Sequence, residues 1–545
     1  MARHQYNQPK ALGLLNRCSC WGAIVVAAIV SGFMGTPLQA AERIHFQYGP
    51  FGFSVTRQDL EQFAETGTMA GTLKMLLSQT QPEFQQQLRL ALQARYEVDP
   101  VLANRFSYTS SGQQLLQEIG TTIQTESRQN GFYALRSALT LAALDPDGLT
   151  ILNFVKHLPT NLYIDVKQAL ALASELQNLL AETRQIVWQM AEETDQIADS
   201  ESEIDFTALE NPKQSGDWPI SKQTLRLYDR DRDRDLVVDL YIPQSSLSRS
   251  PRPIIAISNG LGAKRSRFEK LARHLTSHGF AVVIPEHPGS DRQRLREFYE
   301  GLHRENFAAT EYVDRPLDIS FLLDELARLN SERFGNRLDP DRVGVFGYSF
   351  GGTTALALAG AEIDLTHLQQ ACVSESGILN ISLLYQCRAL ELSSSLPKLS
   401  DERIQAIYAF VPFSRSIYGP QGLAQVNKPV FWEAAEQDIL TPLAIEQIPA
   451  FSWLPENRDR YLAVTSGLPH ARLTLNVLNR LTNQNIAWEE IEPIAETYHQ
   501  MLSLVFFQVH LKNNEAYRPY LGARGIQYLE EKPYRINWRG GNFHP

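Results

Sequence analysis

Residues 347–352 have the composition and spacing of a segment that presents a nucleophilic serine. They read Gly-Tyr-Ser-Phe-Gly-Gly, so Ser349 lies between Gly347 and Gly351. An apolar stretch precedes them and an Ala-rich stretch follows, which is the strand–turn–helix context in which G-x-S-x-G exposes a serine hydroxyl above a sheet. The small neighbours let strand and helix approach closely. We therefore predict a nucleophile at Ser349 rather than an ordinary Gly-rich turn.

A serine hydroxyl becomes an effective nucleophile only when a base takes its proton, and the base needs an acid that orients it. After this kind of turn, the acid and then the histidine follow along the chain. Asp438 follows the apolar residues 430–434, and His470 follows the apolar residues 461–464. Because sites in parallel sheets lie at the carboxyl ends of strands, we predict Asp438 as the acid and His470 as the base.

Both assignments have alternatives. The predicted acid could instead form a turn or cap a helix, with Glu436 as the nearest rival carboxylate and Glu433 as a weaker one. The predicted base could be a surface histidine. His499 and His510 fall in the last predicted helix, from which a side chain reaches the serine poorly.

Acyl transfer also requires backbone N–H groups that bind the oxygen of the tetrahedral intermediate. One donor is the residue after the nucleophile, Phe350, and the other comes from the loop after the third strand. That loop reads Ser-Asn-Gly-Leu-Gly over residues 258–262, so we predict Leu261 as the second donor. A tight glycine turn is the alternative interpretation of this loop, and it is compatible with the role.

From residue 219 onward, short apolar runs alternate with segments of helical spacing. This alternation is typical of a mostly parallel sheet covered by helices on both faces. The predicted strands are 224–228, 236–242, 254–258, 280–285, 342–346, 404–412, 430–434 and 461–464. The predicted helices are 268–278, 316–329, 350–360 and 493–511. We expect residues 219–545 to form an α/β catalytic domain.

Between the first two predicted strands, residues 229–235 read Asp-Arg-Asp-Arg-Asp-Arg-Asp. Alternating acids of this kind resemble a calcium-binding loop. The segment lacks the glycine at the sixth position and the acid at the twelfth, which is Leu240. We interpret it as a solvated hairpin turn.

Upstream of the sheet pattern, residues 41–200 read as an all-helical domain without dominant strand-like alternation. Its longest helical pattern extends from residue 165 to about residue 193. Residues 201–218 are rich in Asp, Glu, Ser, Asn, Pro and Gly, which is typical of a linker.

Residues 1–40 have the order of a secretory signal. Arg3, Lys10 and Arg17 precede an apolar run over residues 21–35, and small residues follow at a plausible cleavage point. The run is short for a membrane span, which needs about 20 residues. We predict a removed signal peptide, export to the periplasm or the extracellular space, and no integral membrane span after signal removal. A retained N-terminal membrane anchor is the alternative.

Two of the four cysteines, Cys372 and Cys387, lie outside the predicted signal. In an exported protein, two cysteines that close a short loop predict a disulfide. Two buried free thiols are the alternative.

The charge pattern excludes some classes of partner. The net charge is −10 with acids and bases interspersed and no long basic run, which argues against nucleic acid because phosphate binding needs clustered Lys and Arg. The sequence contains no zinc spacing, phosphate-binding glycine loop or dinucleotide fingerprint, so we expect no metal and no cofactor.

Several motifs together resemble the platelet-activating-factor acetylhydrolase and dienelactone-hydrolase-like branch of the α/β hydrolases, over about residues 220–510. The segments that carry the resemblance are 258–262, 271–275, 277–280, 285–290, 315–319, 323–326 and 347–352. It implies an α/β-hydrolase fold and hydrolysis of carboxylic esters through an acyl-serine, without metal.

The chain departs from that branch in its oxyanion loop and its nucleophile. The branch usually carries histidine before the loop's glycine, where this chain has Asn259, which puts the loop's supporting hydrogen bonds in doubt. Some members place the acid one strand earlier, but residues 413–416 contain none, which favours Asp438. Dienelactone hydrolases proper use cysteine where this chain has Ser349.

The N-terminal half is similar to a domain of unknown function found before such hydrolases in cyanobacterial proteins. The similarity rests on residues 44–53, 60–67 and 134–138 and implies no activity. A lid, a substrate collar and a docking module all remain open for it.

These patterns predict an exported serine hydrolase that cleaves a small-molecule ester or a lipid. An amidase or peptidase with the same three residues is one alternative. A non-catalytic binding protein on this fold is another, and a third gives the main role to the N-terminal half.

Overall fold

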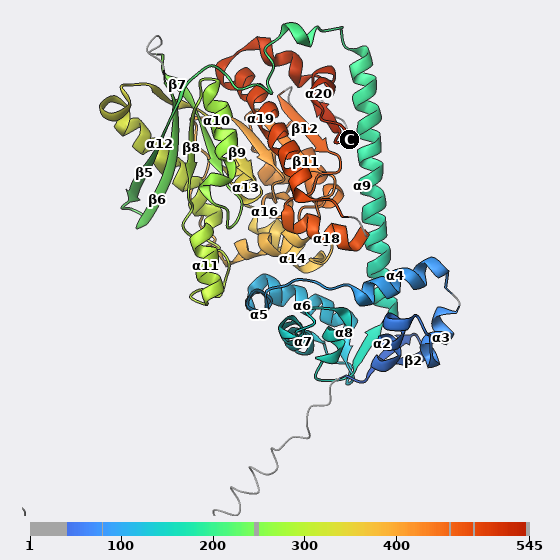
Figure 1. Ribbon diagram of the computed structural model, residues 1–545. Helices are drawn as coiled ribbons and strands as arrows, with labels where there is room; N and C mark the ends of the chain where they lie inside the picture. The colour runs from blue at the N-terminus through green and yellow to red at the C-terminus, as the bar shows by residue number, and fades with distance from the viewer. Residues whose placement is uncertain (1–40, 79, 245–249, 457–458, 483–484, 541–545) are drawn as a thin grey trace, which may run out of the picture.

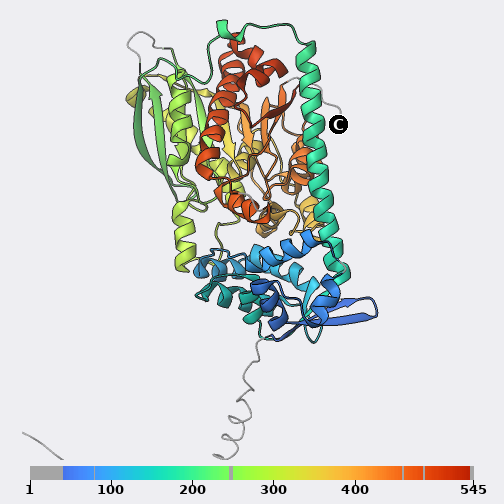
Figure 2. The same ribbon diagram turned by 45° about the vertical axis from the view of Figure 1, so that its right-hand side comes forward.

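The computed structural model describes residues 41–540 apart from 79, 245–249, 457–458 and 483–484. The predicted signal peptide therefore lies outside the described residues. In the described part of the chain, a nine-stranded sheet and a four-stranded sheet form. Figures 1 and 2 show the larger sheet between two layers of helices, the smaller sheet with short helices at one end of it, and one long helix running along both parts.

The nine strands of the larger sheet lie in the order β13-β12-β11-β10-β9-β7-β8-β6-β5. The parallel pairs are β12–β11, β11–β10, β10–β9, β9–β7 and β7–β8, whereas β5–β6, β6–β8 and β12–β13 are antiparallel. The strands are β5 (Ile220–Asp229), β6 (Arg234–Pro243), β7 (Arg252–Ser258), β8 (Ala281–Pro285), β9 (Leu338–Tyr348), β10 (Ile404–Phe410), β11 (Val430–Ala435), β12 (Arg460–Thr465) and β13 (Ile536–Gly540). The sequence predicted all of them except β13.

Helices cover both faces of this sheet. The helices of this part are α10 (Glu269–Ser277), α11 (Arg292–Glu300), α12 (Glu311–Phe334), α13 (Phe350–Leu358), α14 (Leu365–Ser374), α15 (Ile381–Gln386), α16 (Arg415–Leu423), α17 (Ile448–Ser452), α18 (Arg472–Thr482), α19 (Trp488–Lys512) and α20 (Ala523–Leu529). Helices α10, α12, α13 and α19 contact the sheet directly. Two separate hydrophobic cores result, one including α12 and α13 and the other α10 and α19.

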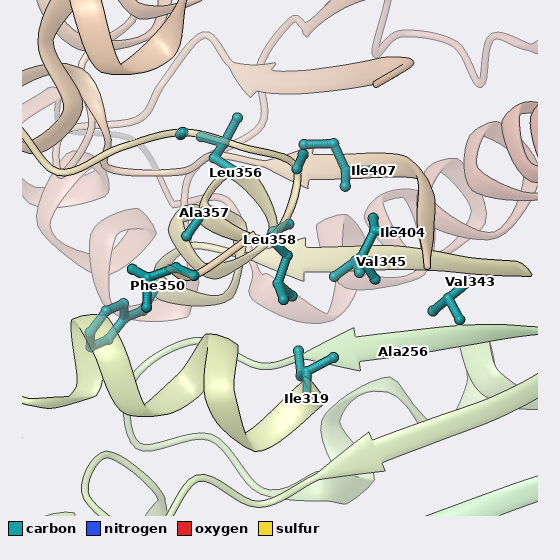
Figure 3. Packing of buried hydrophobic residues seen from close by; sticks show 14 of the residues in the cluster. Ala256, Ile319, Val343, Val345, Phe350, Leu356, Ala357, Leu358, Ile404 and Ile407 are labelled. Carbon is teal, nitrogen blue, oxygen red and sulfur yellow. The ribbon is translucent and has the colours of Figure 1, made fainter. Parts of the chain in front are cut away.

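Strand β9 shows how one sequence supplies both cores. Val343 and Val345 belong to the first core, and Phe346 and Tyr348 to the second. Side chains alternate across a strand, so a strand buried on both faces reads as an almost continuous apolar run. Figure 3 shows the first core, where strand residues pack against Leu356, Ala357 and Leu358 of α13.

The N-terminal region is not all-helical, which corrects the prediction for residues 41–200. Strands in the order β2-β1-β4-β3 form its sheet. They are β1 (Arg43–Tyr48), β2 (Phe51–Thr56), β3 (Ile123–Thr125) and β4 (Leu162–Asp165). These strands have three to six residues. Periodicity over so short a run does not separate strand from helix, so the sequence pattern missed them.

The other elements of this region are helices, of which α2, α3, α4, α7 and α8 pack around a small core of their own. They are α2 (Arg57–Thr66), α3 (Gly71–Leu77), α4 (Pro82–Gln93), α5 (Pro100–Tyr108), α6 (Ser110–Thr122), α7 (Phe132–Leu144), α8 (Ile151–Lys156) and α9 (Val166–Ser200). Within the described ranges, no helix is long and apolar enough to cross a membrane.

Helix α9 packs against the edge of the nine-stranded sheet. The Thr194 hydroxyl accepts a hydrogen bond from the Trp538 backbone N–H at 2.9 Å and approaches the Trp538 carbonyl oxygen at 3.2 Å. Arg539 of β13 pairs with Glu193 at 2.7 Å, and Met190 is part of the large core. The end of the N-terminal region is therefore built into the sheet-bearing part.

A second contact lies where α5 and α6 meet two long connections of the larger part. The Ser110 backbone N–H and hydroxyl each donate to Glu305 at 2.9 Å, and the Ser111 hydroxyl donates to the Leu384 carbonyl at 3.0 Å. Glu118 accepts from the backbone N–H of Gly377 at 3.0 Å. The N-terminal region thus contacts the stretches 286–313 and 361–402, which lie before and after Ser349 in the sequence.

Candidate active site

Ser349 occupies the turn between β9 and α13. Its backbone has φ 54° and ψ −116°, a conformation that costs free energy for a residue with a side chain and that clusters at functional sites. A β-carbon on Gly347 would lie 2.1 Å from the Gly351 carbonyl oxygen, and one on Gly351 would lie 1.8 Å from the Ser258 carbonyl oxygen. The two glycines are therefore required because the backbones leave no space for a side chain.

The structure brings the three predicted catalytic side chains into one hydrogen-bonded chain. Asp438 follows β11 and His470 follows β12, both at the carboxyl ends of parallel strands. The His470 Nδ1 lies 2.6 Å from Asp438 Oδ2, and its Nε2 lies 3.1 Å from Ser349 Oγ. His470 and Asp438 are buried, whereas Ser349 is partly exposed. We refer to these three residues as the elbow triad.

The surroundings of Asp438 keep it ionised. Burial alone would raise the pKa of this carboxyl, but the charge and hydrogen bond of His470, with the hydrogen bonds of Thr441, outweigh burial and lower the pKa below its usual value. The Thr441 hydroxyl donates to Oδ2 at 2.5 Å, and the backbone N–H groups of Leu440 and Thr441 donate to Oδ1 at 2.8 and 2.9 Å. A carboxylate can only accept, so His470 presents N–H at Nδ1 and leaves Nε2 free to take the serine proton.

The rival carboxylates have other partners. Glu436 accepts from the Gly467 backbone N–H at 2.9 Å. Glu433 is buried between the Tyr408 hydroxyl at 2.5 Å and His499 Nδ1 at 3.1 Å. His499 is therefore part of a different pair.

The predicted oxyanion loop lies against the serine. A β-carbon on Gly260 would meet the Tyr348 ring at 3.0 Å and the Ser349 Cβ at 3.4 Å. The N–H of Phe350, in the first turn of α13, has no acceptor within its own helix. Among the described residues, the Leu261 N–H has no acceptor either. Both predicted donors thus lack an acceptor among the described residues, which the predicted role requires.

A disulfide joins Cys372 and Cys387, with their Cα atoms 5.9 Å apart. It links the end of α14 to the segment after α15. Gly377 and Leu384, which contact α6, lie between the two cysteines in sequence. The disulfide therefore closes the connection on which the N-terminal region docks.

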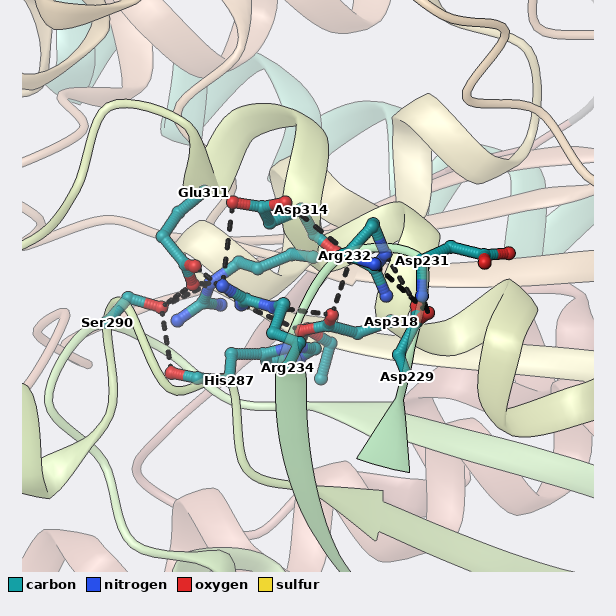
Figure 4. Close-up of polar contacts among 11 residues, drawn as sticks. Asp229, Asp231, Arg232, Arg234, His287, Ser290, Glu311, Asp314 and Asp318 are labelled. Carbon is teal, nitrogen blue, oxygen red and sulfur yellow. Dashed lines mark hydrogen bonds and ion pairs between the residues drawn. The ribbon is translucent and has the colours of Figure 1, made fainter. Parts of the chain in front are cut away.

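The Arg-Asp repeat forms the predicted hairpin turn between β5 and β6, but only one side of it is solvated, which corrects part of its interpretation. The exposed side carries Arg230, Asp231, Asp233 and Asp235. The side chains of Arg232 and Arg234 are only 19% and 13% exposed. Both bind Asp318 Oδ1 of α12, at 2.9 and 2.8 Å, and Arg234 also binds Glu311 at 2.6 Å (Figure 4). Alternate residues near a strand point to the same side, and here that side faces the carboxylates of α12.

These ion pairs lead to a second serine–histidine–aspartate chain, which the sequence did not reveal. His287 Nδ1 lies 2.9 Å from Asp318 Oδ2, and its Nε2 lies 3.1 Å from Ser258 Oγ. All three side chains are buried. We call Ser258, His287 and Asp318 the buried triad. Residues 258, 287 and 318 lie within motifs that carry the family resemblance. The sequence therefore pointed to these residues but did not show that they contact one another.

Comparison with known families agrees with this architecture. Residues 253–385 match the family model described as alpha/beta hydrolase fold. Residues 40–165 match a family described as alpha/beta hydrolase of unknown function (DUF1400). No curated protein matches the chain. The larger part therefore has the α/β-hydrolase fold, which supports a hydrolase in general and implies a small-molecule substrate.

Proposed function

We propose that this protein is a serine hydrolase that cleaves carboxylic esters through an acyl-serine intermediate. The observation that carries the proposal is the hydrogen-bonded order Ser349–His470–Asp438, with distances of 3.1 and 2.6 Å, at a strained turn that exposes the hydroxyl. These are the geometric relations that define a nucleophile, its base and the group that orients the base.

In the proposed reaction, His470 Nε2 takes the Ser349 proton while Oγ attacks the ester carbonyl carbon. The N–H groups of Phe350 and Leu261 stabilise the oxyanion of the tetrahedral intermediate. His470 then donates its proton to the leaving alkoxide, and the C–O bond breaks to leave an acyl-serine. His470 then deprotonates a water molecule, which attacks the acyl carbon. The bond to Ser349 Oγ breaks, His470 returns the proton to that oxygen, and the acid leaves.

The choice of ester over amide rests on the sequence resemblance to an acetylhydrolase-like branch. We further propose that the protein works outside the cytoplasm. The leader-like residues 1–40 and the disulfide between Cys372 and Cys387 support this location, since disulfides persist in oxidising compartments.

Labelling with a fluorophosphonate probe, together with turnover of p-nitrophenyl esters of increasing chain length, tests the reaction. We expect the wild-type protein to label and to turn over esters, and Ser349→Ala to do neither while unfolding at the same temperature. Matched anilides in the same assay separate esterase from amidase. A folded wild-type protein that neither labels nor hydrolyses any substrate would contradict the proposal.

A further inference from the structure

A buried arginine on α12 touches both segments that carry the predicted oxyanion donors. Arg315 is 1% exposed. Its Nη1 donates to the Asn259 carbonyl oxygen at 2.6 Å, and its guanidinium lies 4.3 Å from the ring centroid of Phe350. One side chain therefore contacts the residue two places before Leu261 and the side chain of the other predicted donor.

The same arginine reaches the far side of the loop through Ser290. Arg315 Nε donates to the Ser290 hydroxyl at 2.8 Å, and the Ser290 carbonyl accepts from the Gly262 N–H at 2.8 Å. The Asn259–Gly260 peptide is thus held directly, and the Leu261–Gly262 peptide is held through Ser290, so that the loop is fixed before and after the Leu261 N–H. Glu311, 3.6 Å from Arg315 Nε, balances the buried charge.

The contact to Asn259 explains how the loop is held without the histidine that the similar hydrolases carry there. The Asn259 side-chain oxygen is buried, and the part of the chain that the structure describes supplies no partner for it. The loop is instead held at the main-chain carbonyl of that residue. Burial lowers the pKa of Arg315 to about 10, so the guanidinium stays charged at neutral pH.

We propose that Arg315 is a positioning residue for the oxyanion hole, fixing the loop that carries Leu261 against the Phe350 end of α13. This role rests on the proposed function. It requires a planar group that donates in two directions while its face lies on an aromatic ring. Lysine carries the same charge, but its ammonium group has neither the divergent N–H donors nor the planar surface of a guanidinium.

The test compares Arg315→Lys with Arg388→Lys. Arg388 is a matched control, because it is 4% exposed, donates to the Phe307 carbonyl at 2.6 Å and lies 4.4 Å over the Phe307 ring, away from residues 258–262. Each variant is assayed for kcat and KM with a p-nitrophenyl ester. Each is also assayed for the inhibition constant of a trifluoromethyl ketone, to which Ser349 adds to form an oxyanion.

Complete removal of one oxyanion donor costs roughly 10²- to 10³-fold in kcat. We expect a displaced donor in Arg315→Lys to lower kcat by about 10- to 100-fold and to weaken the ketone by a similar factor, with KM changed less than about threefold. Arg388→Lys should alter kcat and ketone affinity less than about threefold, even if both variants melt earlier.

A folded Arg315→Lys with wild-type kcat and ketone affinity would overturn the role, and so would equal losses in the two variants. If Arg315→Lys does not fold, Ser290→Ala takes its place. It removes the acceptor of Nε and should lower kcat by about 3- to 10-fold with the same pattern, whereas unchanged kcat overturns the role. The activity of the wild-type protein is measured first. An inactive wild-type protein would contradict the proposed reaction itself, whereas an active one with an unaffected Arg315→Lys would contradict only the role of Arg315.

Discussion

The elbow triad and the buried triad are two hydrogen-bonded chains of identical composition. The imidazole-to-carboxylate distance is 2.6 Å in the elbow triad and 2.9 Å in the buried triad. The imidazole-to-hydroxyl distance is 3.1 Å in both. Side-chain contacts alone do not separate a candidate active site from a structural network.

The backbone and the solvent access of the serine separate them. Ser349 stands at a strained turn and is partly exposed, whereas Ser258 is the fully buried last residue of β7. The carboxylates differ too, since Asp318 is shared with two arginines. The comparison teaches that presentation of the hydroxyl, rather than the triad composition, defines the nucleophile.

The largest expected effect comes from removing each hydroxyl in turn. Ser349→Ala should lower kcat for esters by roughly 10⁴- to 10⁶-fold, because the covalent route is lost. Ser258→Ala should change kcat by less than about tenfold, since no substrate reaches that hydroxyl. Steady-state kinetics of both variants measure this, and a loss in Ser258→Ala as large as that in Ser349→Ala would erase the distinction.

The next effect separates the two aspartates by function. Asp438→Asn should keep the fold but lower kcat by about 10⁴-fold, because an amide no longer holds His470 with N–H at Nδ1. The melting temperature of the variant serves as the control. Ester turnover within tenfold of wild type would show that another group orients the imidazole.

Asp318→Asn should chiefly reduce stability. It removes the carboxylate that Arg232 and Arg234 share, and breaking a buried ion pair by removing one partner costs about 3–5 kcal/mol. Asp229 still pairs with Arg232 and Glu311 with Arg234, so we expect a loss near the lower end of that range. Urea unfolding measures the loss. A stability within 1 kcal/mol of wild type would mean that solvent or neighbouring acids replace the aspartate.

The smallest effect concerns the dependence of stability on pH. Burial lowers the pKa of His287 below its usual value of 6.5, despite the opposing hydrogen bond of Asp318. As pH falls, His287 therefore binds a proton at a higher pH in the unfolded chain than in the folded chain. The stabilisation is complete above about pH 6.5 and is lost as pH falls through the lower folded pKa, by at most about 1.4 kcal/mol per pH unit.

His287→Gln should flatten this acid-side slope of the unfolding free energy between pH 4.5 and 7. The other histidines whose pKa is lowered, such as His274 at about 4, remain in both proteins and cancel in the difference. Denaturant titrations at several pH values give the slopes. Equal slopes would indicate that folding does not change the pKa of His287.

The sequence sufficed for the elements whose pattern is strong. Strands β7 to β12 are apolar runs between helical segments, and each was predicted within a few residues. Strand β13 and the small N-terminal sheet were not, because their short runs carry no distinguishing period. The long helix α9 was predicted, but its docking on β13 was not, since a helical pattern does not name the surface that covers it.

The sequence by itself determined the strand–turn–helix around Ser349, the glycines that this turn requires, and the order of the three predicted catalytic residues. These are local, because turn geometry and strand pattern depend on neighbouring residues. Only the tertiary structure decided that Glu436 and Glu433 bind elsewhere and that the two arginines Arg232 and Arg234 of the Arg-Asp repeat turn inward onto α12. Those outcomes depend on contacts between residues that are far apart in the sequence. The place of Arg315 between the two oxyanion segments depends on such contacts too.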